Sequence, residues 1–447
     1  MLARYLSLVG RRSAAPYRPQ RLPAKFDNVV VAMSSGVDSS VAAALFAGEF
    51  PNTRGIYMQN WSESQSLDDP SKEPCYEKDW KDVNRVAEHL NIPVSKINFE
   101  QDYWIDVFEP MLRGYNEGST PNPDIGCNKF VKFGKLREWL DEKYGTNNYW
   151  LVTGHYARVM QEMERKQLFH LLRSVYRPKD QSYYLSQINS TILPSLLLPI
   201  GHLTKPEVRD LAKQAGLPTA AKPDSQGICF VNNSQHGKFK NFLKHYLPSS
   251  PGNIITVDPQ SGAKTRWGGH DGLWSYTIGQ KVGISMPQGD PNYQGSWFVS
   301  EKLKNTNEIV IVRGRDNAAL YKDTIRIGNF ASMSPKEDTI EALRDIASLT
   351  LQFRSLQVPV KIKSCTLHGF ALTNAENLDI TIELASNQRA MAPGQSCCLY
   401  IGDRVLGSGP ISQVDGSNTH TPHQKTTENH LSRSVPLDNL DQLKNAI

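Results

Sequence analysis

The sequence predicts an α/β fold, with a parallel-sheet domain first and antiparallel β structure after it. In the first half, short β-branched runs alternate with helical patterns, which is typical of a parallel sheet covered by helices on both faces. From about residue 252 onward, short β-type runs are separated by Gly, Pro, Asn and Asp. That spacing is typical of a small antiparallel barrel or sandwich.

The expected elements follow in a regular order. Strands are predicted at residues 28–33, 55–58, 92–99 and 149–154, and helices at 37–48, 78–90, 101–115 and 130–145. A further helix is predicted over 204–216, where Thr204 and Glu207 form a capping box and Gly216 ends the helix. A last short helix is expected around Phe239 to Tyr246.

Charge is distributed unevenly along the 447 residues. The formal net charge is +5, but residues 1–26 hold six basic residues and no carboxylate, which leaves the rest at 5 − 6 = −1. Such an Arg-rich, acid-free segment predicts a mitochondrial transit peptide over 1–26, the alternative being a basic arm that touches nucleic acid. No apolar run is long enough to span a membrane, so no membrane insertion is expected. Residues 413–447 are polar and are expected to form a disordered tail.

A small-residue loop lies between the first predicted strand and the first helix. It comprises Ala32, Met33, Ser34, Ser35, Gly36, Val37, Asp38 and Ser39. Backbone N–H groups of such a loop, together with the helix dipole, favour a bound phosphate. Asp38 is the candidate ligand for a magnesium ion. The alternative is an ordinary capped start of a helix.

The six cysteines form no CxxC pair and predict free thiols. Cys127 is expected at the start of a helix with Lys129 and Lys132 nearby, which predicts a depressed pKa. Asp124, three residues earlier, is a candidate proton donor or acceptor at the same site. Cys229 lies in a second polar loop. For both thiols the alternative is a small buried hydrophobic residue. The other cysteines are Cys365, Cys397 and Cys398, expected in strands without chemistry, and Cys75, whose role stays open.

The loop at 32–39 resembles the PP-loop of the ATP pyrophosphatase superfamily, SGGxDS, with Ser35 in place of the first Gly. Further motifs occur in the order found in tRNA-specific 2-thiouridylases, and the chain resembles the mitochondrial member of that family. The motifs are YMQNW at 57–61, TPNPD at 120–124, CNK at 127–129, TGHYAR at 153–158, KDQSYYL at 179–185, GICF at 227–230, YTIGQ at 276–280 and APGQ at 392–395.

This resemblance, which covers about residues 27–412, implies three domains. They are a PP-loop ATP-binding catalytic domain over 27–235, a small central tRNA-contacting domain over 236–300 and a C-terminal β-barrel over 301–412. It also implies ATP-dependent 2-thiolation of the wobble uridine of mitochondrial tRNAs for Lys, Glu and Gln, in the matrix, with ATP and magnesium.

The resemblance also implies residue roles. Ala32 to Ser39 would hold the phosphates and Met58 and Gly154 the adenosine, while Asn122, Pro123 and Asp124 would meet the target base. Cys229 would carry a persulfide received from a cysteine desulfurase or sulfur relay. Cys127 would be the partner thiol, which either attacks the activated carbon or releases sulfide by forming a disulfide with Cys229. Contacts with tRNA are implied for His155, Lys179, Asp180, Gln181, Arg354, Ser355 and Gln395.

Three alternatives stay open at this point. Cys127 and Cys229, with or without Cys75, would instead ligate an iron-sulfur cluster. A second alternative is that the chain is another PP-loop enzyme, which acts on a small molecule. A third is that the chain is a non-catalytic RNA-binding protein. For the aromatic residues Trp267, Trp274 and Tyr276, a place in the β core is favoured over RNA contact.

Overall fold

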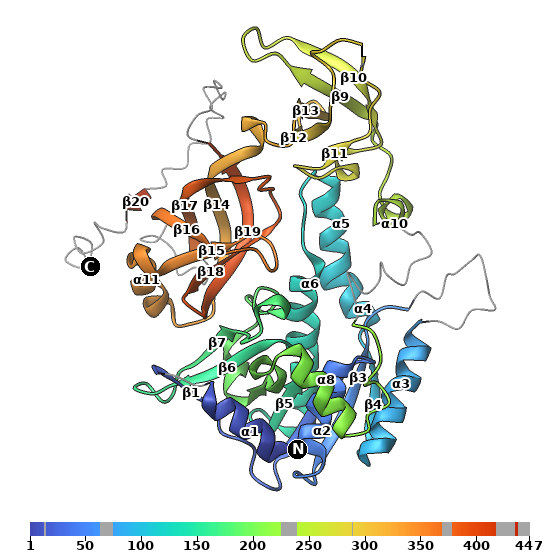
Figure 1. Cartoon of the computed structure of the whole chain (residues 1–447), viewed down its shortest axis with the longest axis vertical. Coiled ribbons are helices and arrows are strands. Elements are labelled where there is room, and N and C mark those ends of the chain that lie inside the picture. Colours follow the sequence, from blue (N-terminus) through green and yellow to red (C-terminus); the bar gives the residue numbers. More distant parts are fainter. Residues whose placement is uncertain are drawn as a thin grey trace. The chain divides into compact units, whose positions relative to one another are not determined.

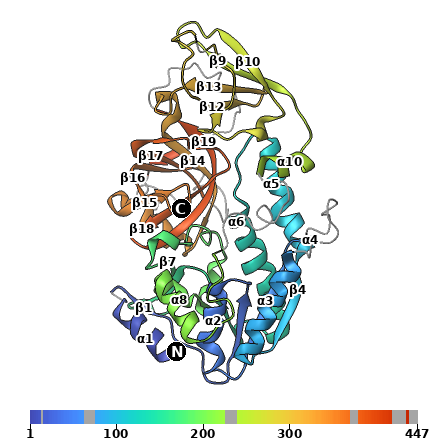
Figure 2. The same cartoon turned by 45° about the vertical axis from the view of Figure 1, so that its right-hand side comes forward.

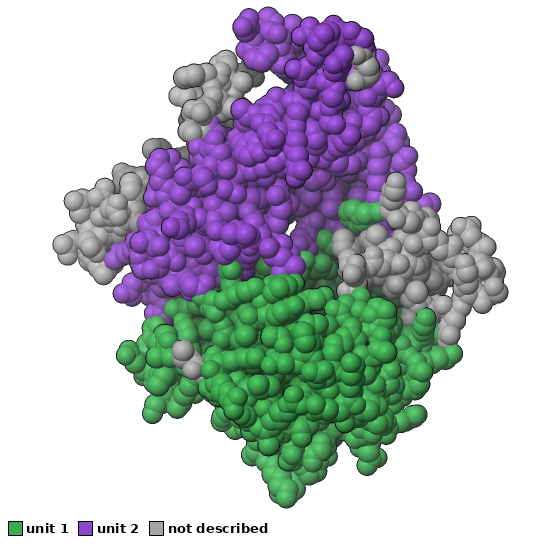
Figure 3. Space-filling model, in the orientation of Figure 1, with its two compact units in different colours: residues 1–109, 123–239, 403–406 green, residues 110–122, 240–402, 407–447 purple. Residues whose placement is uncertain are grey.

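The computed structural model describes residues 1–12, 15–62, 75–224, 239–287, 289–368 and 378–416, with the backbone of Cys75 and of the short strand β20 (Ser434–Pro436). The chain divides into two compact units (Figure 3). Unit 1 comprises residues 1–109, 123–239 and 403–406, and unit 2 comprises 110–122, 240–402 and 407–447.

Unit 1 is built around a five-stranded parallel sheet (Figure 1). In spatial order the strands are β4 (Val94–Asn98), β3 (Thr53–Gln59), β2 (Asn28–Met33), β5 (Tyr149–Thr153) and β8 (Leu196–Leu197). Val29, Val30 and Val31 of the central strand are all fully buried, as expected for a sheet covered on both faces. The strand order reverses between β2 and β5, and α/β sheets bind ligands at the carboxyl ends of strands at such a switch point.

Four helices share one apolar core with this sheet. They are α1 (Leu2–Arg11), α2 (Val37–Ala47), α3 (Cys75–Leu90) and α8 (Lys205–Gln214). The capping box predicted for α8 is confirmed, because the Thr204 hydroxyl accepts from the Glu207 amide while Glu207 accepts from the Thr204 amide. Gly216, at φ +63°, follows its end. The helix after residue 239 is also confirmed, as α10 (Phe239–Tyr246).

A run of helices connects β4 to β5 (Figure 2) and contains two π-helical stretches. Its elements are α4 (Glu100–Tyr103), the π-helix η1 (Trp104–Phe108), α5 (Glu109–Asn116), α6 (Pro123–Gly126), the π-helix η2 (Cys127–Lys135) and α7 (Leu136–Tyr144). The amide of Leu136 donates to the carbonyl of Val131, five residues earlier, which is the π pattern. Such stretches are frequent at functional sites.

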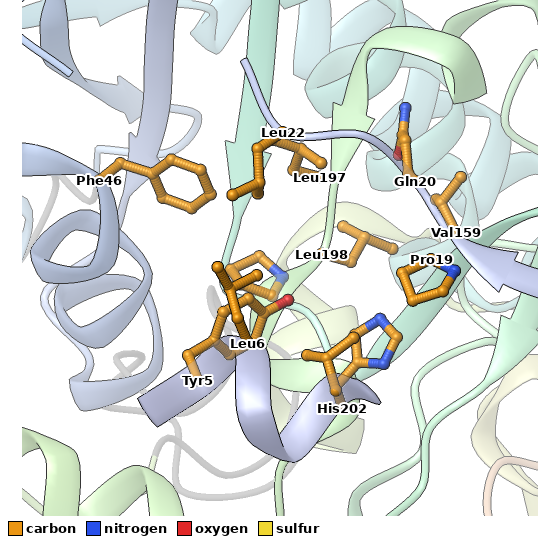
Figure 4. Close-up of a pocket in the computed structure, with 12 residues that line it drawn as sticks. Tyr5, Leu6, Pro19, Gln20, Leu22, Phe46, Val159, Leu197, Leu198 and His202 are labelled. Carbon is orange, nitrogen blue, oxygen red and sulfur yellow. The ribbon is translucent and has the colours of Figure 1, made fainter. Parts of the chain in front are cut away.

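Helix α1 packs on unit 1. It buries Leu2, Tyr5 and Val9, and the Arg12 guanidinium that follows it makes two hydrogen bonds of 2.8 and 2.9 Å to the Glu207 carboxylate. Figure 4 shows a cavity beneath the helix, lined by Tyr5, Leu6, Pro19, Leu22, Phe46 and His202 among others. The apolar face of α1 therefore lines a cavity together with other residues of unit 1.

Residues 15–26 are tied to unit 1 by backbone and buried polar contacts. Strand β1 (Tyr17–Pro19) pairs antiparallel with β6 (Ala157–Glu162), which pairs with β7 (Phe169–Arg173). The Gln20 side chain is buried and its amide donates to the Leu193 and Pro194 carbonyls at 3.0 and 2.5 Å. The Arg21 guanidinium lies 4.7 Å from the centre of the Trp150 ring.

Unit 2 contains a five-stranded central sheet. In spatial order its strands are β10 (Lys264–His270), β9 (Gly252–Val257), β13 (Glu308–Arg313), β12 (Trp297–Leu303) and β11 (Lys281–Val282). Trp267 and Tyr276 pack against its core cluster, and Trp274 is 4% exposed, so the prediction that these aromatics form core is confirmed. Because β13 pairs with β9, the hairpin β12–β13 belongs to the central sheet, and that domain extends to Arg313, past the expected boundary at 300.

The second part of unit 2 is the antiparallel β-barrel. Its strands are β14 (Tyr321–Ser332), β15 (Leu349–Gln352), β16 (Val360–His368), β17 (Leu378–Arg389), β18 (Ser396–Ile401) and β19 (Arg404–Asp415), with α11 (Lys336–Arg344) after β14. Pairing of β19 with both β14 and β18 closes it. Cys365, Cys397 and Cys398 lie in its strands β16 and β18, which confirms the expected strand positions, and all three are buried. Strand β19 extends to Asp415, so residues 413–415 are barrel and not tail.

The predicted fold class is thus confirmed, with the parallel sheet, the central domain and the barrel in the expected order. Within the described ranges, no helix combines the length and apolarity needed to cross a membrane.

Candidate active site

The loop after β2 is shaped by its own hydroxyl groups. Ser39 donates from its hydroxyl to the carbonyls of Ser34 and Gly36 and accepts from the Ser34 amide at 3.0 Å. Ser40 donates to the Gly36 carbonyl at 2.9 Å. Helix α2 starts at Val37, directly after Gly36. The loop is therefore held in one shape at the positive end of α2, which is the arrangement that favours a bound phosphate.

Only some side chains of this loop are accessible to a ligand. Met33 and Val37 are 2% exposed and belong to the apolar core. Ser35 is also buried, while Ser34 is exposed. Residues 32–39 can thus contact a ligand chiefly through backbone N–H groups and the side chains of Ser34 and Asp38. Met58, at the end of β3 beside β2, is partly buried.

Gly154 follows β5 and approaches the loop closely. A Cβ atom at Gly154 would lie 2.6 Å from the amide nitrogen of Ser39 and 2.8 Å from the carbonyl carbon of Asp38. Any side chain at Gly154 would therefore displace the start of α2. The segment Thr153–Gly154–His155 and the PP-loop form the two sides of the switch point between β5 and β2.

Asp38 is part of an ionic network within unit 1. The Lys205 ammonium donates to both carboxylate oxygens of Asp38, at 2.7 and 2.9 Å, and the Tyr156 hydroxyl donates at 3.0 Å. Lys205 also lies 2.8 Å from Asp224. Burial works against the charge on Asp224, but hydrogen bonds from Lys179 and Lys205 hold its pKa well below the usual range.

This network bears on the expected magnesium site. Magnesium is usually held by one or two carboxylates together with substrate phosphates, and Asp38 supplies one carboxylate. Both of its oxygens, however, are bonded to Lys205. Among the residues that the structure describes, no group of three His, Cys, Asp or Glu side chains is arranged to hold a metal ion. Magnesium would therefore have to be bound mainly through phosphate oxygens.

Cys127, Asp124 and Lys132 lie together on α6 and η2. Cys127 opens the π-helix, in which hydrogen bonds join residues five apart, so Lys132 lies one π-turn from the thiol. Lys132 favours the ionised forms of both Cys127 and Asp124. The buried Asn128 side chain donates to the Asp124 carbonyl at 2.9 Å and fixes this turn. The structure thus brings a thiol, a carboxyl and an ammonium group into one short segment.

The expected depressed pKa of Cys127 is wrong for this state of the protein. Burial raises the pKa of the Cys127 thiol, and Lys132 offsets this only in part. Because η2 continues α6, Cys127 lies past the first helical turn and is 6% exposed. Burial also raises the pKa of Asp124, against the opposing effect of Lys132, so this carboxyl group keeps its proton to a higher pH than usual.

His155 lies between the loop at residues 32–39 and this segment. Its Nδ1 lies 2.7 Å from the Thr153 hydroxyl and its ring lies 5.7 Å from that of Phe133 on η2. Burial, with a smaller effect of Lys132, lowers the pKa of His155 to about 3. The imidazole is therefore neutral at physiological pH. Consecutive residues, Gly154 and His155, thus contact the PP-loop on one side and face the cysteine segment on the other.

The other expected tRNA contacts of unit 1 have partners inside the unit. Lys179 is 40% exposed and pairs with Asp224 at 2.8 Å. Asp180 is buried and accepts hydrogen bonds from Ser174 and Ser182. The Gln181 side chain accepts from the Tyr156 amide at 2.9 Å. Asp180 and Gln181 therefore shape the loop that presents Lys179.

In unit 2, two expected tRNA contacts brace the loop between β17 and β18. The exposed Arg354 donates to the Arg389 and Ala390 carbonyls. The Gln395 side chain accepts from the Ala392 amide at 3.3 Å. Ser355, next to Arg354, is partly exposed.

The second candidate cysteine lies outside the described residues. Cys229 belongs to the segment 225–238, and the side chain of Cys75 is likewise not described. The expected meeting of Cys229 with Cys127, by persulfide chemistry or by an iron-sulfur cluster, therefore stays a prediction. Asp224, five residues before Cys229, is bonded to Lys205 and thereby shares a partner with Asp38 of the PP-loop.

Sequence reasoning missed Lys205, Tyr156 and Asp224 as site residues. Lys205 lies 167 positions from Asp38, so no local pattern joins them. One signal was present: the capping box at Thr204 locates the start of α8, and Lys205 is its first residue. Tyr156 lies in the TGHYAR motif next to His155, and Asp224 lies five residues before Cys229.

Comparisons with known proteins match this arrangement. Three family models cover the chain: a tRNA methyl transferase HUP domain at residues 27–233, a tRNA methyl transferase PRC-barrel domain at 240–313 and an aminomethyltransferase beta-barrel domain at 322–411. The chain is 84% identical over 420 residues to mitochondrial tRNA-specific 2-thiouridylase 1 of Saccharomyces cerevisiae, covering 94% of this chain and 100% of that protein.

A bacterial protein is also similar. The tRNA-specific 2-thiouridylase MnmA of Lactiplantibacillus plantarum is 38% identical over 383 residues, covering 86% of this chain and 94% of that protein. Among solved structures, the NMN synthetase of Francisella tularensis matches with a TM-score of 0.27 and 16% identity, covering 50% of this chain and 76% of that one.

Proposed function

Because the chain belongs to the tRNA-specific 2-thiouridylase family, we propose that it is a mitochondrial sulfurtransferase that replaces O2 of the wobble uridine of tRNA with sulfur. The reaction uses ATP, which the PP-loop family binds. The observation that carries the proposal is the link through Gly154 and His155. It joins a phosphate-binding loop to a segment with a thiol, a carboxyl group and an ammonium group.

Two chemical steps fit this arrangement. In the first, O2 of the uridine attacks the α-phosphorus of ATP, and pyrophosphate leaves. The C2–O bond is then part of an adenylate, whose AMP is a good leaving group. In the second, sulfur attacks C2 and AMP departs, so one sulfur replaces one oxygen. Water must be excluded meanwhile, because it would hydrolyse the adenylate.

For the sulfur step, we propose that Cys229 carries a persulfide supplied by a cysteine desulfurase or sulfur relay. The Cys127 thiolate attacks the inner sulfur, a Cys127–Cys229 disulfide forms, and sulfide is released to attack C2. An external thiol then reduces the disulfide. In the other order, the terminal sulfur attacks C2 first and Cys127 then breaks the S–S bond. An iron-sulfur cluster on these cysteines is the competing mechanism.

In this proposal Asp124 transfers a proton and Lys132 stabilises the thiolate of Cys127. Because burial raises the pKa of Asp124, this carboxyl group holds a proton that it can donate more readily than an exposed carboxylate could. Asn122, Pro123 and Asp124 would receive the base, which a single-stranded anticodon loop can extrude at low energetic cost. Lys132 stabilises the Cys127 thiolate once the proton has left. The neutral His155 borders the same space without competing for that proton.

The phosphate groups would meet the backbone of residues 34–39 and the Lys205 ammonium, which is already fixed beside the loop by Asp38 and Asp224. Magnesium would enter with the phosphates and neutralise charge on them, with Asp38 as the protein ligand. Met58 and Gly154 would border the adenosine.

The tRNA is a polyanion, so it would be held by the exposed cations Lys179 and Arg354 together with Lys129 near the thiol. His155, Asp180, Gln181, Ser355 and Gln395 would act mainly by shaping these surfaces. The substrates we propose are the mitochondrial tRNAs for Lys, Glu and Gln.

We further propose the mitochondrial matrix as the compartment and α1 as the import signal. The helix is amphipathic, basic and free of acidic residues. Residues 15–26, however, include β1 and the buried Gln20. We therefore place the end of any removed segment before β1, in place of the expected residue 26.

The test is a reconstituted reaction with unmodified tRNA, ATP and a persulfide donor. Wild-type protein is expected to release pyrophosphate only when tRNA is present and to form 2-thiouridine. Cys127→Ser should still release pyrophosphate but form no 2-thiouridine. Full turnover by Cys127→Ser would favour a small-molecule PP-loop enzyme, and no pyrophosphate release by wild-type protein would favour a non-catalytic RNA-binding protein.

A further inference from the structure

The loop of residues 118–121, here called the entry loop, immediately precedes the Asn122–Pro123–Asp124 motif in the chain. It begins where α5 ends. The Gly118 amide donates to the Tyr115 carbonyl and the Ser119 amide to the Gly114 carbonyl, both at 2.9 Å. With Gly118 at φ +81°, these bonds form a Schellman motif that satisfies the helix carbonyls. These bonds use the Gly118 amide but not the Gly118 carbonyl, which accepts a hydrogen bond from outside the helix.

That partner is a lysine of the central sheet. The Lys302 ammonium, on β12, donates to the Gly118 carbonyl at 3.0 Å. Leu273 packs on the same glycine, since a Cβ atom there would lie 3.2 Å from Leu273 Cδ1. The central sheet therefore contacts the entry loop at its first residue.

The barrel contacts the entry loop two residues later. The Thr120 amide donates to the Pro393 carbonyl at 2.8 Å. Gly394, at φ +89°, lies so close that a Cβ atom would be 2.7 Å from the Thr120 nitrogen. Pro393 and Gly394 belong to the loop after β17, which Arg354 braces through its bonds to Arg389 and Ala390. Two residues of the entry loop, Gly118 and Thr120, are thus fixed from two sides.

From these contacts we infer that Lys302 is a positioning residue of the thiolation reaction: with Pro393–Gly394 it fixes the entry loop, and thereby the chain that leads into the base-binding motif. This inference rests on the proposed function of Asn122, Pro123 and Asp124. It assigns to the central sheet and the barrel the task of holding the stretch of chain that directly precedes the base-binding motif.

The chemistry of Lys302 suits this role. Burial, with a smaller effect of Lys304, lowers the pKa of Lys302 to about 8. Lys304 itself is exposed and lies 3.7 Å from Glu117. An ammonium donor bonds a carbonyl more strongly than a neutral amine does. The grip of Lys302 on the entry loop should therefore weaken as the pH rises through 8.

The test compares Lys302→Met, which keeps the apolar stem, with Lys304→Met on the same segment as the control. Lys302→Met is expected to lower kcat for 2-thiouridine formation about tenfold, or about 1.4 kcal/mol, the size of one charge-assisted hydrogen bond. The Kd values for tRNA and ATP should stay within about twofold of those of Lys304→Met, the precision of such a comparison.

A second variant keeps the test valid if Lys302→Met folds poorly. Lys302→Arg retains a charged donor, so it should retain most of kcat, and the decline of kcat with a midpoint near pH 8 in wild-type protein should move to higher pH. An unchanged kcat in Lys302→Met, a loss confined to the Kd for tRNA, or the same decline in wild-type protein and Lys302→Arg would each overturn the inference. Inactivity of wild-type protein itself would instead overturn the proposed function.

Discussion

Gly154 and Ser39 lie in backbone contact, so that a Cβ atom on Gly154 would be 2.6 Å from the Ser39 nitrogen. The partner atom is backbone at the start of α2 and cannot rotate away. Through this contact the end of β5 fixes the distance between the nucleotide loop and the segment that bears Cys127. Gly154 is therefore the residue at which the end of β5 meets the loop that we propose binds ATP.

We predict that Gly154→Ala lowers tRNA-dependent pyrophosphate release by about 100-fold, since displacement of reacting groups by about 1 Å has effects of this size. The control is Gly48→Ala at the other end of α2, where an added Cβ meets nothing within 4 Å. It should release pyrophosphate at the wild-type rate. Equal rates for both variants would show that the contact does not matter.

Asp124→Asn should lower the rate of thiolation by roughly 10² to 10⁴, the usual contribution of a general acid or base. It should leave the Kd for tRNA nearly unchanged, because the amide fills the same space. Single-turnover formation of 2-thiouridine measures the first quantity and filter binding the second. A rate within about threefold of wild type, far smaller than the loss expected for a general acid or base, would remove Asp124 from the chemistry.

The same substitution should change the pH dependence of stability. Because burial raises the pKa of folded Asp124, the folded protein binds this proton more tightly than the unfolded chain, and stability falls as pH rises through the folded pKa. Asp124→Asn lacks that loss, so its Tm should gain on wild type as the pH rises from about 4, near the unfolded pKa of a carboxyl group. Asp258, whose pKa is lowered by hydrogen bonds from Ser261, is the control: its contribution to stability is already complete above the unfolded pKa of about 3.9, so the Tm difference between Asp258→Asn and wild type should stay constant as the pH rises further.

Cys127 should react slowly with iodoacetamide in the free protein. Burial raises the pKa of this thiol, so its thiolate fraction and access are both low. Peptide mapping by mass spectrometry should show alkylation at least about tenfold slower than for free cysteine. Lys132→Met should slow it further, while the buried Cys398 stays unmodified in both proteins. Alkylation of Cys127 faster than free cysteine would contradict this account.

Truncation should separate the two parts of the N-terminal segment. A protein lacking residues 2–12 loses α1 and the Arg12–Glu207 bonds but keeps β1, and it should fold with a lowered Tm. Removal of residues 2–26 also deletes β1 and the buried Gln20, so its Tm should be lower still. Intact-mass analysis of protein from mitochondria should find an N-terminus before Tyr17. A mature N-terminus at residue 27 would contradict the revised boundary.

The fold could be predicted further than the site. Alternating β-branched and helical runs indicated the parallel sheet, and the capping box located α8, because such signals are local. The shift of the central-domain boundary to Arg313 could not be predicted, since it depends on the pairing of β13 with β9, more than fifty residues earlier. The Asp38–Lys205 ion pair was missed for the same reason.

The pKa of Cys127 illustrates a different limit. The sequence shows Lys129 and Lys132 near the thiol, and charge proximity alone predicts a lowered pKa. It does not show that η2 continues α6 and buries the sulfur. Desolvation then outweighs the effect of Lys132, which reverses the direction of the shift.

Above all, we propose that this protein makes 2-thiouridine in mitochondrial tRNA. This activity is tested most directly by mass spectrometry of nucleosides from mitochondrial tRNA in cells that lack the protein, with wild-type protein or Cys127→Ser supplied back. We predict that 2-thiouridine derivatives disappear, return with wild-type protein and stay absent with Cys127→Ser. Unchanged levels of these nucleosides in cells without the protein would contradict the claim.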